Sequence, residues 1–153
     1  MRDLLTRLVL EHFPRQNVKY AVGYGSAVFK QANYGDENCV IDMLLMVDST
    51  EEFHSANLTS NYNHYSYWPK RLPLSVTDGL QNSGASLYFN PLIPLSKFGG
   101  SFAEDQRKIK YGVIGVDKAL EDLNEWNTFC LAGRLQKPVL PFITESTEVA
   151  DAM

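Results

Sequence analysis

The sequence predicts an α+β domain in which a mixed β-sheet is flanked by helices. Short runs of apolar and β-branched residues alternate with segments whose apolar residues recur every three or four positions, which indicates strands alternating with helices. Of the 153 residues, 44% are hydrophobic, so the chain can bury one core and is too short for two ordinary domains. We therefore expect a single domain spanning residues 1–153.

The N-terminal part is expected to begin with a helix over residues 3–12. This helix should end at Phe13, because the residue before a proline is pushed out of the helical region. A β-rich run at 18–22 then leads into the turn Gly23-Tyr24-Gly25-Ser26. The side chain of Ser26 can cap a short helix over 27–31.

Residues 40–47 form a nearly continuous apolar run, which is typical of a strand covered on both faces. Asp42 is the one charged residue in that run. The next helix should begin near Ser49 or Thr50, either of which can cap it, and continue to about Tyr62.

The second half of the chain alternates in the same way. Pro91 and Pro94 should end a strand, Gly99-Gly100 indicates a loop, and apolar residues at helical spacing predict a long helix. The expected elements are a weak helix at 74–81, strands at 85–89 and 109–114, a mobile loop at 96–106, a long helix at 117–135 and an edge strand at 138–143.

The composition excludes several classes of protein. A formal net charge of −4 and a pI near 5.3 give no general attraction to nucleic acid. Cys39 and Cys130 do not form a C-x-x-C pair, so neither a disulfide framework nor a sulfur-rich zinc site is indicated. No apolar run approaches the roughly 18 to 20 residues that span a bilayer, so any membrane contact should be peripheral. Asp3 and Glu11 favour a domain helix over a transit peptide at the N-terminus.

The turn Gly23-Tyr24-Gly25-Ser26 could seat a phosphate. Glycine lets the backbone approach a ligand closely, and a helix beginning after Ser26 would point free N–H groups at an anion. A Walker A loop and a full G-x-G-x-x-G motif would both need glycine where Val28 stands. A plain structural turn is the alternative.

Asp42 is the strongest candidate for a metal ligand. An ionised carboxylate in an apolar strand is costly unless it is paired or binds a cation. Mg²⁺ beside the Gly-Ser turn would offset that cost and neutralise a triphosphate. The order strand, Gly-Ser turn, helix and strand-borne Asp resembles the DNA polymerase beta-like nucleotidyltransferases, which implies their fold. The alternative is an Asp42 that bonds backbone amides or a basic side chain at the mouth of the strand.

A second metal ligand has to come from elsewhere in the chain. That superfamily commonly has Asp-x-Asp, whereas Leu44 stands two positions after Asp42. Asp48 would lie about 20 Å further along an extended strand, which is too far for a shared metal ion. Asp122 is our candidate, and a solvated helix face is the alternative interpretation of the acids around it.

Six motifs follow one another along the chain: Gly23-Tyr24-Gly25-Ser26-Ala27-Val28-Phe29-Lys30-Gln31, Ile41-Asp42, His54-x-x-Asn57-Leu58, Asn61-x-x-His64-Tyr65-Ser66, Lys110-Tyr111-Gly112-Val113-Ile114 and Ala132-Gly133-Arg134-Leu135-Gln136-Lys137-Pro138-Val139. In this order they are similar to those of the mitochondrial translocator-assembly-and-maintenance cytidylyltransferases, and the match runs from about Tyr20 to Val139. The resemblance implies a Mg²⁺-dependent phosphatidate cytidylyltransferase. Such an enzyme makes CDP-diacylglycerol and pyrophosphate from CTP and phosphatidic acid, for cardiolipin synthesis at the matrix face of the mitochondrial inner membrane.

The chain departs from that family in three respects. Ala27 stands where the family usually has a glycine after Gly-Ser, and the segment 96–106 looks longer than the family's connection. The further, largely helical sequence of family members, which are about twice as long, is expected to be absent here.

Four polar residues, His54, Asn57, Asn61 and His64, recur at spacings of three and four. One helix can therefore turn them toward a nucleotide cleft, where we expect them to bind base, ribose or lipid phosphate. Polar residues on a helix surface, with a satisfied histidine, are the alternative.

Lys110, Arg134 and Lys137 are the cations expected to bind the triphosphate or the phosphatidate headgroup, since a guanidinium can grip phosphate oxygens in two places. We place Lys110 in the catalytic centre with Asp42 and Asp122. For Arg134 and Lys137 the alternative is stabilisation of a helix C-terminus.

Partners other than CTP and phosphatidic acid are limited to membrane lipid, with neither nucleic acid nor an obligate protein partner expected. The apolar segments 88–93 and 98–102 could dip into a bilayer. Two alternatives remain for the function: a dinucleotide-binding fold with Asp48 as the ribose-binding acid, and an inactive fragment or assembly scaffold.

Overall fold

The computed structural model describes residues 1–29, 39–67, 70–71, 73, 79, 81, 83–84 and 86–153. These residues form a five-stranded sheet in the order β3-β4-β2-β1-β5. Strands β2 and β4 are parallel and the other neighbours are antiparallel, so the predicted α+β class with a mixed sheet is confirmed. The strands are β1 (Val18–Tyr24), β2 (Val40–Val47), β3 (Tyr88–Pro94), β4 (Lys108–Gly115) and β5 (Val139–Thr144).

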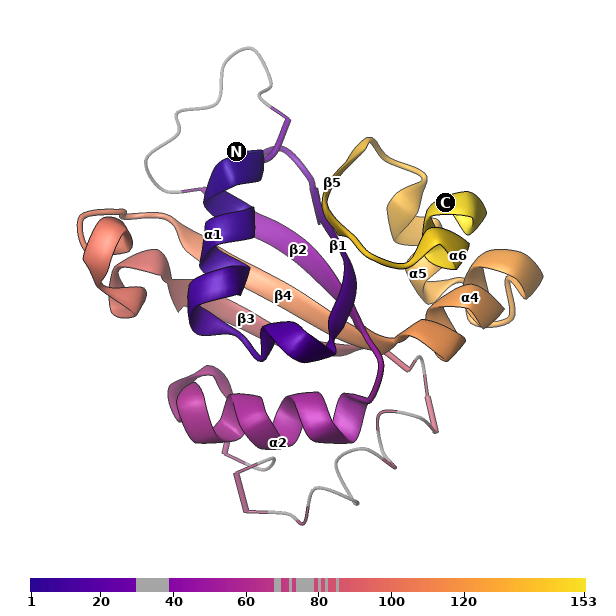
Figure 1. Cartoon of the computed structure of the whole chain (residues 1–153), viewed down its shortest axis with the longest axis horizontal. Helices are drawn as coiled ribbons and strands as arrows, with labels where there is room; N and C mark the ends of the chain where they lie inside the picture. Colours follow the sequence, from indigo (N-terminus) through magenta and orange to yellow (C-terminus); the bar gives the residue numbers. More distant parts are fainter. Residues whose placement is uncertain are drawn as a thin grey trace.

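Helices pack on both faces of this sheet (Figure 1). Because successive residues of a strand point to opposite faces, β2 contributes Met43 and Leu45 to one core cluster and Leu44 and Met46 to the other. Helices α1 and α2 pack on the first face, and α4, α5 and α6 pack on the second. The helices are α1 (Arg2–His12), α2 (Thr50–Ser60), α4 (Val116–Glu125), α5 (Cys130–Leu135) and α6 (Thr147–Ala152), with short 3-10 turns η1 (Arg15–Asn17), η3 (Tyr62–His64), η4 (Leu95–Phe98) and η5 (Gly100–Phe102).

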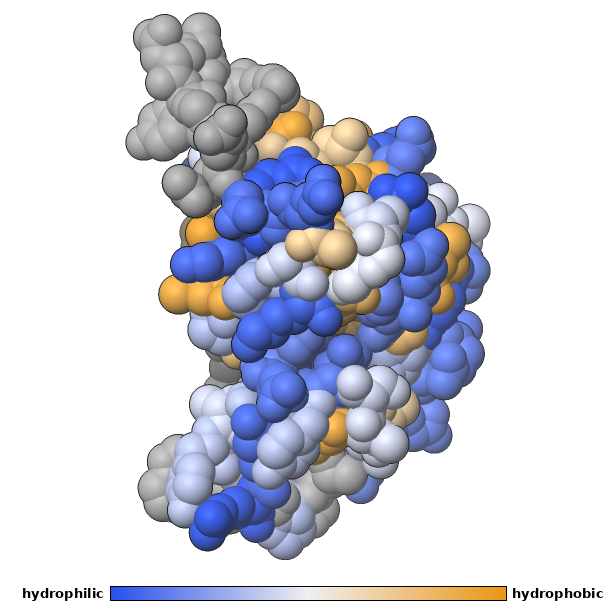
Figure 2. Space-filling model, turned by 90° about the vertical axis from the view of Figure 1, so that its left-hand side faces the viewer, coloured by the Kyte–Doolittle hydropathy of each residue, from blue (hydrophilic) through white to orange (hydrophobic). Residues whose placement is uncertain are grey.

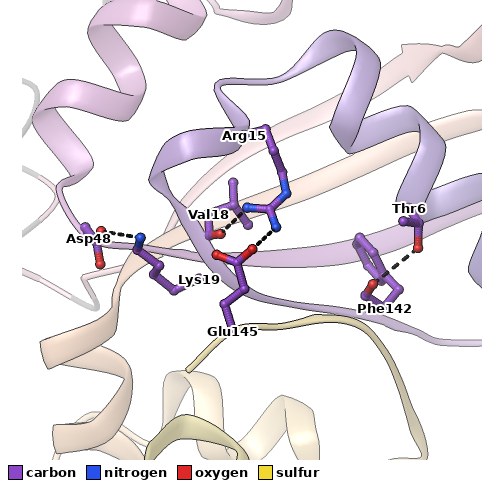
Figure 3. Close-up of polar contacts among 7 residues, drawn as sticks. All are labelled: Thr6, Arg15, Val18, Lys19, Asp48, Phe142 and Glu145. Atoms are coloured by element: carbon purple, nitrogen blue, oxygen red, sulfur yellow. Dashed lines mark hydrogen bonds and ion pairs between the residues drawn. The ribbon is translucent and has the colours of Figure 1, made fainter. Parts of the chain in front are cut away.

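Polar contacts fix the start of β1 to its neighbours (Figure 3). The guanidinium of Arg15 donates to the carbonyl of Val18 at 2.8 Å and forms an ion pair with Glu145, which follows β5. On the other side, Lys19 Nζ lies 3.0 Å from Asp48 Oδ2, beyond the end of β2. Asp48 is therefore paired at the end of β2 remote from Asp42, which does not favour its role as a ribose-binding acid.

Several predicted elements are present with nearly the predicted bounds. The helix at 3–12 is α1 and the run at 40–47 is β2. The side chain of Ser49 caps α2, as one of the two predicted caps, by accepting from the Glu52 N–H at 3.2 Å. The strand expected at 109–114 lies within β4, and the strand expected at 138–143 is β5, at the sheet edge.

The glycine turn is shorter than predicted. Strand β1 continues to Tyr24, and the turn after it is closed by hydrogen bonds from the N–H groups of Val28 and Phe29 to the carbonyl of Gly25. The described residues here form one hydrogen-bonded turn in place of the start of a helix, and the rest of the predicted helix, 30–31, lies outside the described residues. Most of the weak helix predicted over 74–81 also lies outside them.

Strand β3 runs through both of the prolines that were predicted to end it. Its pairing with β4 shifts register between Asn90 and Ile93, and β3 is at the edge of the sheet. A proline on the outer side of an edge strand removes no hydrogen bond from the ladder. The prediction that Pro91 and Pro94 end this strand, over residues 85–89, is therefore wrong.

Residues 95–98 and 100–102 form the 3-10 turns η4 and η5, within the segment 96–106 that we predicted to be a mobile loop. Phe102 is 1% exposed and belongs to the α1 and α2 core cluster, against which Phe98 also packs. The prediction that Phe102 dips into a bilayer is therefore wrong. Figure 2 views the molecule from the side that lies on the left in Figure 1, where η4 and η5 are, and it shows mostly hydrophilic residues with apolar ones scattered among them. Among the described residues, no helix is both long enough and apolar enough to cross a membrane.

The long helix predicted over 117–135 is interrupted. Trp126 caps the end of α4 with a φ of 58°, and Phe129 precedes α5 with a φ of 54°. Bulky residues rarely adopt this left-handed conformation, so other contacts must hold the chain here. Those contacts come from Asp122, which the periodicity of the apolar residues does not reveal.

Candidate functional site

Asp42 lies on β2 directly between Tyr24 of β1 and Lys110 of β4 in the strand register. Its side chain points to the same face as Leu44, the face on which α4, α5 and α6 pack. The side chain is 28% exposed. Asp42 is therefore a partly buried carboxylate that solvent and ligands can still reach.

The glycine turn lies against this carboxylate. Gly25 has a φ of +83°, and a Cβ atom added there would lie 3.3 Å from Asp42 Oδ2. A side chain at this position would be strained and would crowd the carboxylate. The structure thus brings together the two features on which the predicted site depends, the Gly-Ser turn and Asp42.

The other residues of the turn have different surroundings. A Cβ atom on Gly23 would lie only 2.7 Å from Leu5 Cδ1 of α1, so Gly23 is needed for packing. Ser26 is exposed in the turn. Tyr24 lies beside Asp42 and hydrogen-bonds Arg134; burial and then the charge of Asp42 raise the pKa of Tyr24, against the opposing effect of Arg134.

Two cations flank Asp42. Lys110 Nζ lies 3.9 Å from Asp42 Oδ1, and Arg134 is close enough to act on the same carboxyl group. Burial raises the pKa of Asp42 above its ordinary value, and the charges of Lys110 and Arg134 offset only part of that effect. A carboxylate with this residual cost of ionisation is stabilised by a further cation. One carboxylate beside two basic side chains suits Mg²⁺ carried by a polyphosphate, since Mg²⁺ commonly takes one or two protein carboxylates and completes its shell with phosphate and water.

Both cations also lie over the ring of Phe89 on β3. Lys110 Nζ is 4.7 Å from the ring centroid and Arg134 Cζ is 4.9 Å from it. Arg134 is held further by donating from Nη1 to the Cys130 carbonyl at 2.7 Å. Lys137 is exposed beyond the end of α5, and its role stays a prediction.

Asp122 does not have the geometry of the second metal ligand we predicted. It is 4% exposed, and both carboxylate oxygens accept hydrogen bonds. Oδ1 accepts from the N–H and hydroxyl of Thr128 at 3.0 and 2.6 Å, and Oδ2 accepts from the N–H groups of Leu131 and Ala132 at 2.7 and 3.0 Å. Asp122 therefore caps the N-terminus of α5. Within the described part of the chain, no three His, Cys, Asp or Glu residues gather as a metal site.

The polar stripe on α2 lies behind the sheet, so our prediction that it turns toward the same cleft as Asp42 does not hold. Tyr111 follows Lys110 on β4 and therefore points to the opposite face. Asn57 donates to the hydroxyls of Tyr111 and Tyr65, both at 2.9 Å, and His64 Nδ1 lies 3.0 Å from the Tyr111 hydroxyl. The polar side chains of α2 and of the turn after it thus bond to one another and to buried tyrosine hydroxyls.

The remaining two residues of the stripe belong to the same network. His54 is 1% exposed, with Nδ1 2.8 Å from the Tyr65 hydroxyl and Nε2 3.0 Å from Gln81 Oε1. Asn61 donates to the His12 carbonyl and to Asn57 Oδ1, both at 2.7 Å. These bonds satisfy polar groups that would otherwise be costly to bury.

His64 should make the protein less stable in acid. Burial, with the charges of Lys97 and His12, lowers the pKa of His64 to about 4. The unfolded chain then takes up a proton that the folded protein rejects, so stability should fall as pH drops from about 6.5 toward about 4. Urea unfolding across this range should show a smaller pH dependence in His64→Gln than in the wild type, and equal slopes would contradict the assignment.

Phe89 is the site residue that sequence reasoning missed, because we assigned its segment to membrane contact. It pairs with Gly112 across the sheet. A glycine inside a strand often marks a close approach by another group, so Gly112 in the motif after Lys110 was the available signal.

Comparison with known proteins identifies the family. A family model described as "Phosphatidate cytidylyltransferase, mitochondrial" matches residues 6–153. Proteins of that name are 39% identical to this chain in Rattus norvegicus, over 96% of the chain and 42% of the relative, and in Homo sapiens, over 87% and 28%. The protein of that name in Saccharomyces cerevisiae is 39% identical over 79% of the chain and 29% of the relative. The chain thus spans less than half the length of these relatives. On the strength of the match over residues 6–153, this chain belongs to the mitochondrial phosphatidate cytidylyltransferase family.

Proposed function

We propose that this chain forms the nucleotidyltransferase core of a phosphatidate cytidylyltransferase, which converts CTP and phosphatidic acid to CDP-diacylglycerol and pyrophosphate. The observation that carries the proposal is the carboxylate of Asp42 set against the Gly25 turn and flanked by Lys110 and Arg134. This arrangement occurs in a chain whose relatives carry that enzyme's name. We assign to it the DNA polymerase beta-like nucleotidyltransferase fold on the order of strand, Gly-Ser turn and strand-borne Asp.

In this reaction a phosphatidate oxygen attacks the α-phosphorus of CTP. A bond forms between that oxygen and the α-phosphorus, the bond from the α-phosphorus to the bridging oxygen breaks, and pyrophosphate leaves with the bonding electrons. The attacking phosphate oxygen is already ionised at neutral pH, so no general base is needed. Positioning of the two anions and neutralisation of their charge therefore provide most of the catalysis.

The residues around Asp42 divide this work. The turn at Gly25 and Ser26 seats the triphosphate through backbone N–H groups. Lys110 and Arg134 bind phosphate oxygens and lower the repulsion between the triphosphate and the lipid phosphate.

Asp42 would hold Mg²⁺, with phosphate oxygens of CTP among its other ligands. The ion would supply charge neutralisation on the triphosphate and its leaving pyrophosphate. Asp42 fits this role because its carboxylate is partly exposed and its ionisation is not fully compensated by Lys110 and Arg134.

The relatives are named as mitochondrial proteins, and we extend that location to this chain as part of the same proposal. Because its lipid substrate resides in a bilayer, the enzyme would work as a peripheral protein at the matrix face of the mitochondrial inner membrane. With Phe102 in the core, that contact would use another part of the surface.

Turnover of labelled CTP tests the proposal. The purified protein, with Mg²⁺ and vesicles containing phosphatidic acid, should release pyrophosphate and transfer the cytidylyl group into the lipid fraction. Product should depend on both CTP and phosphatidic acid. A protein that neither binds CTP nor forms lipid product would overturn the proposal and favour the scaffold alternative.

A further inference from the structure

The ring of Phe89 joins the sheet to α5 through the two cations of the site. Lys110 comes from β4 and Arg134 from α5, yet both lie within 5 Å of the same ring centroid. An aromatic face attracts cations through its quadrupole, most strongly where water is partly excluded. Phe89 is itself partly buried, so this attraction is not fully screened.

The missing side chain of Gly112 in β4 leaves room for the ring of Phe89. Phe89 is the cross-strand partner of Gly112, and a Cβ atom on Gly112 would lie 2.8 Å from Phe89 Cε1 and 2.7 Å from Leu44 Cδ2. The ring therefore occupies space that any side chain at position 112 would take. Lys110, two residues earlier, shares this strand face, and its ammonium reaches the ring from there.

The position of Lys110 is informative because a direct bond to Asp42 is within its reach. The two residues are neighbours in the parallel register of β2 and β4, yet Nζ lies 3.9 Å from Oδ1. A charge-assisted hydrogen bond between an ammonium and a carboxylate is about 2.7–2.9 Å long. The ammonium thus lies near both the carboxylate and the ring and makes no direct hydrogen bond to Asp42.

We propose that Phe89 is a positioning residue that holds Lys110 and Arg134 over its ring, where both can bind phosphate and neither closes on Asp42. This inference rests on the proposed function. Without the ring, the ammonium of Lys110 would be free to pair directly with Asp42. It would then compete with the divalent cation for Asp42. Lys110 would also no longer be positioned to bind the triphosphate.

Phe89→Leu removes the aromatic face and keeps an apolar side chain. Calorimetric titration with CTP in the absence of divalent cations should show about tenfold weaker binding, equivalent to about 1.4 kcal/mol, because the ring no longer holds the two cations in place before CTP arrives. In turnover assays the Mg²⁺ concentration for half-maximal rate should rise, while kcat at saturating CTP and Mg²⁺ changes little.

Two matched variants show whether the aromatic face is the cause. Phe89→Tyr keeps the aromatic face and should retain wild-type CTP affinity. Tyr88→Leu removes the preceding ring, which packs on His54 and Tyr65 behind the sheet, and should leave CTP affinity unchanged. Should Phe89→Leu not fold, Phe89→Met takes its place as an apolar side chain without an aromatic face.

A double-mutant cycle with Lys110→Met provides the decisive result. If Phe89 acts through Lys110, the loss of CTP affinity caused by Phe89→Leu should shrink in the Lys110→Met background. Fully additive losses, or wild-type affinity in Phe89→Leu, would overturn the inference while leaving the proposed function intact. A wild-type protein that does not bind CTP would instead overturn the proposed function itself.

Discussion

Asp42→Asn should lower the rate of CTP turnover by at least about 10²–10³-fold, the effect of removing one preorganised charge-stabilising group from an active site. Asparagine keeps the size of the side chain and loses the negative charge that would hold Mg²⁺. The rate should be measured as labelled lipid product at saturating CTP, across a range of Mg²⁺ concentrations. Excess Mg²⁺ should not restore activity to the variant.

The same substitution should not lower the melting temperature at neutral pH. The raised pKa of Asp42 means that ionising this carboxyl group costs more in the folded protein than in the unfolded chain. Folding stability is therefore lost as pH rises through the pKa of Asp42, and the neutral asparagine avoids that loss.

Asp48→Asn is the matched control. Asp48 lies beyond the far end of β2 and pairs with Lys19, with its side chain 55% exposed, so its loss should leave turnover nearly unchanged. Full activity in Asp42→Asn, or equal losses in both variants, would contradict the assignment of the site.

Much of the fold could be predicted from local signals. The apolar run at 40–47 fixed β2 to the residue, and the preproline Phe13 and the Ser49 cap gave the end of α1 and the start of α2. The breaks within the C-terminal half could not be predicted in this way. The helix over 117–135 keeps its apolar spacing through Trp126, but it is interrupted there, where the side chain of Asp122 binds backbone groups six to ten residues further on.

Part of the site could also be predicted from the sequence, and part could not. A carboxylate alone in a buried strand was enough to make Asp42 the candidate, and the structure places it beside the glycine turn as expected. The stripe on α2 misled us because helical spacing shows that residues share a face but not which face of the sheet they meet. That choice depends on Tyr111, whose hydroxyl draws Asn57 and His64 to the side opposite Lys110.

Asp122→Asn distinguishes a capping carboxylate from a metal ligand. Asparagine would turn its amide group toward backbone N–H groups that now donate to the carboxylate, leaving buried donors without acceptors. Losing hydrogen bonds to a buried charged group costs about 3 kcal/mol. For a chain of this length that corresponds to a drop of about 6–12 °C in melting temperature.

The pH dependence of stability should change in the same variant. Burial by itself raises the pKa of Asp122, but the hydrogen bonds from Thr128, Ala132 and Leu131 outweigh it, so the pKa lies below its ordinary value. The stability contributed by the ionised carboxylate is therefore present above about pH 4 and is lost as pH falls through the lowered pKa. Asp122→Asn should lack this part of the acid dependence.

Glu121→Gln provides the control for that experiment, because Glu121 precedes Asp122 on α4 and makes an exposed pair with Lys118. It should melt close to the wild type. A metal-ligand role for Asp122 would give the reverse pattern, with wild-type melting and lost turnover in Asp122→Asn. The capping role instead couples thermal stability to turnover, because α5 carries Arg134 to the site. Loss of activity in Asp122→Asn should therefore follow the loss of folded protein as temperature rises.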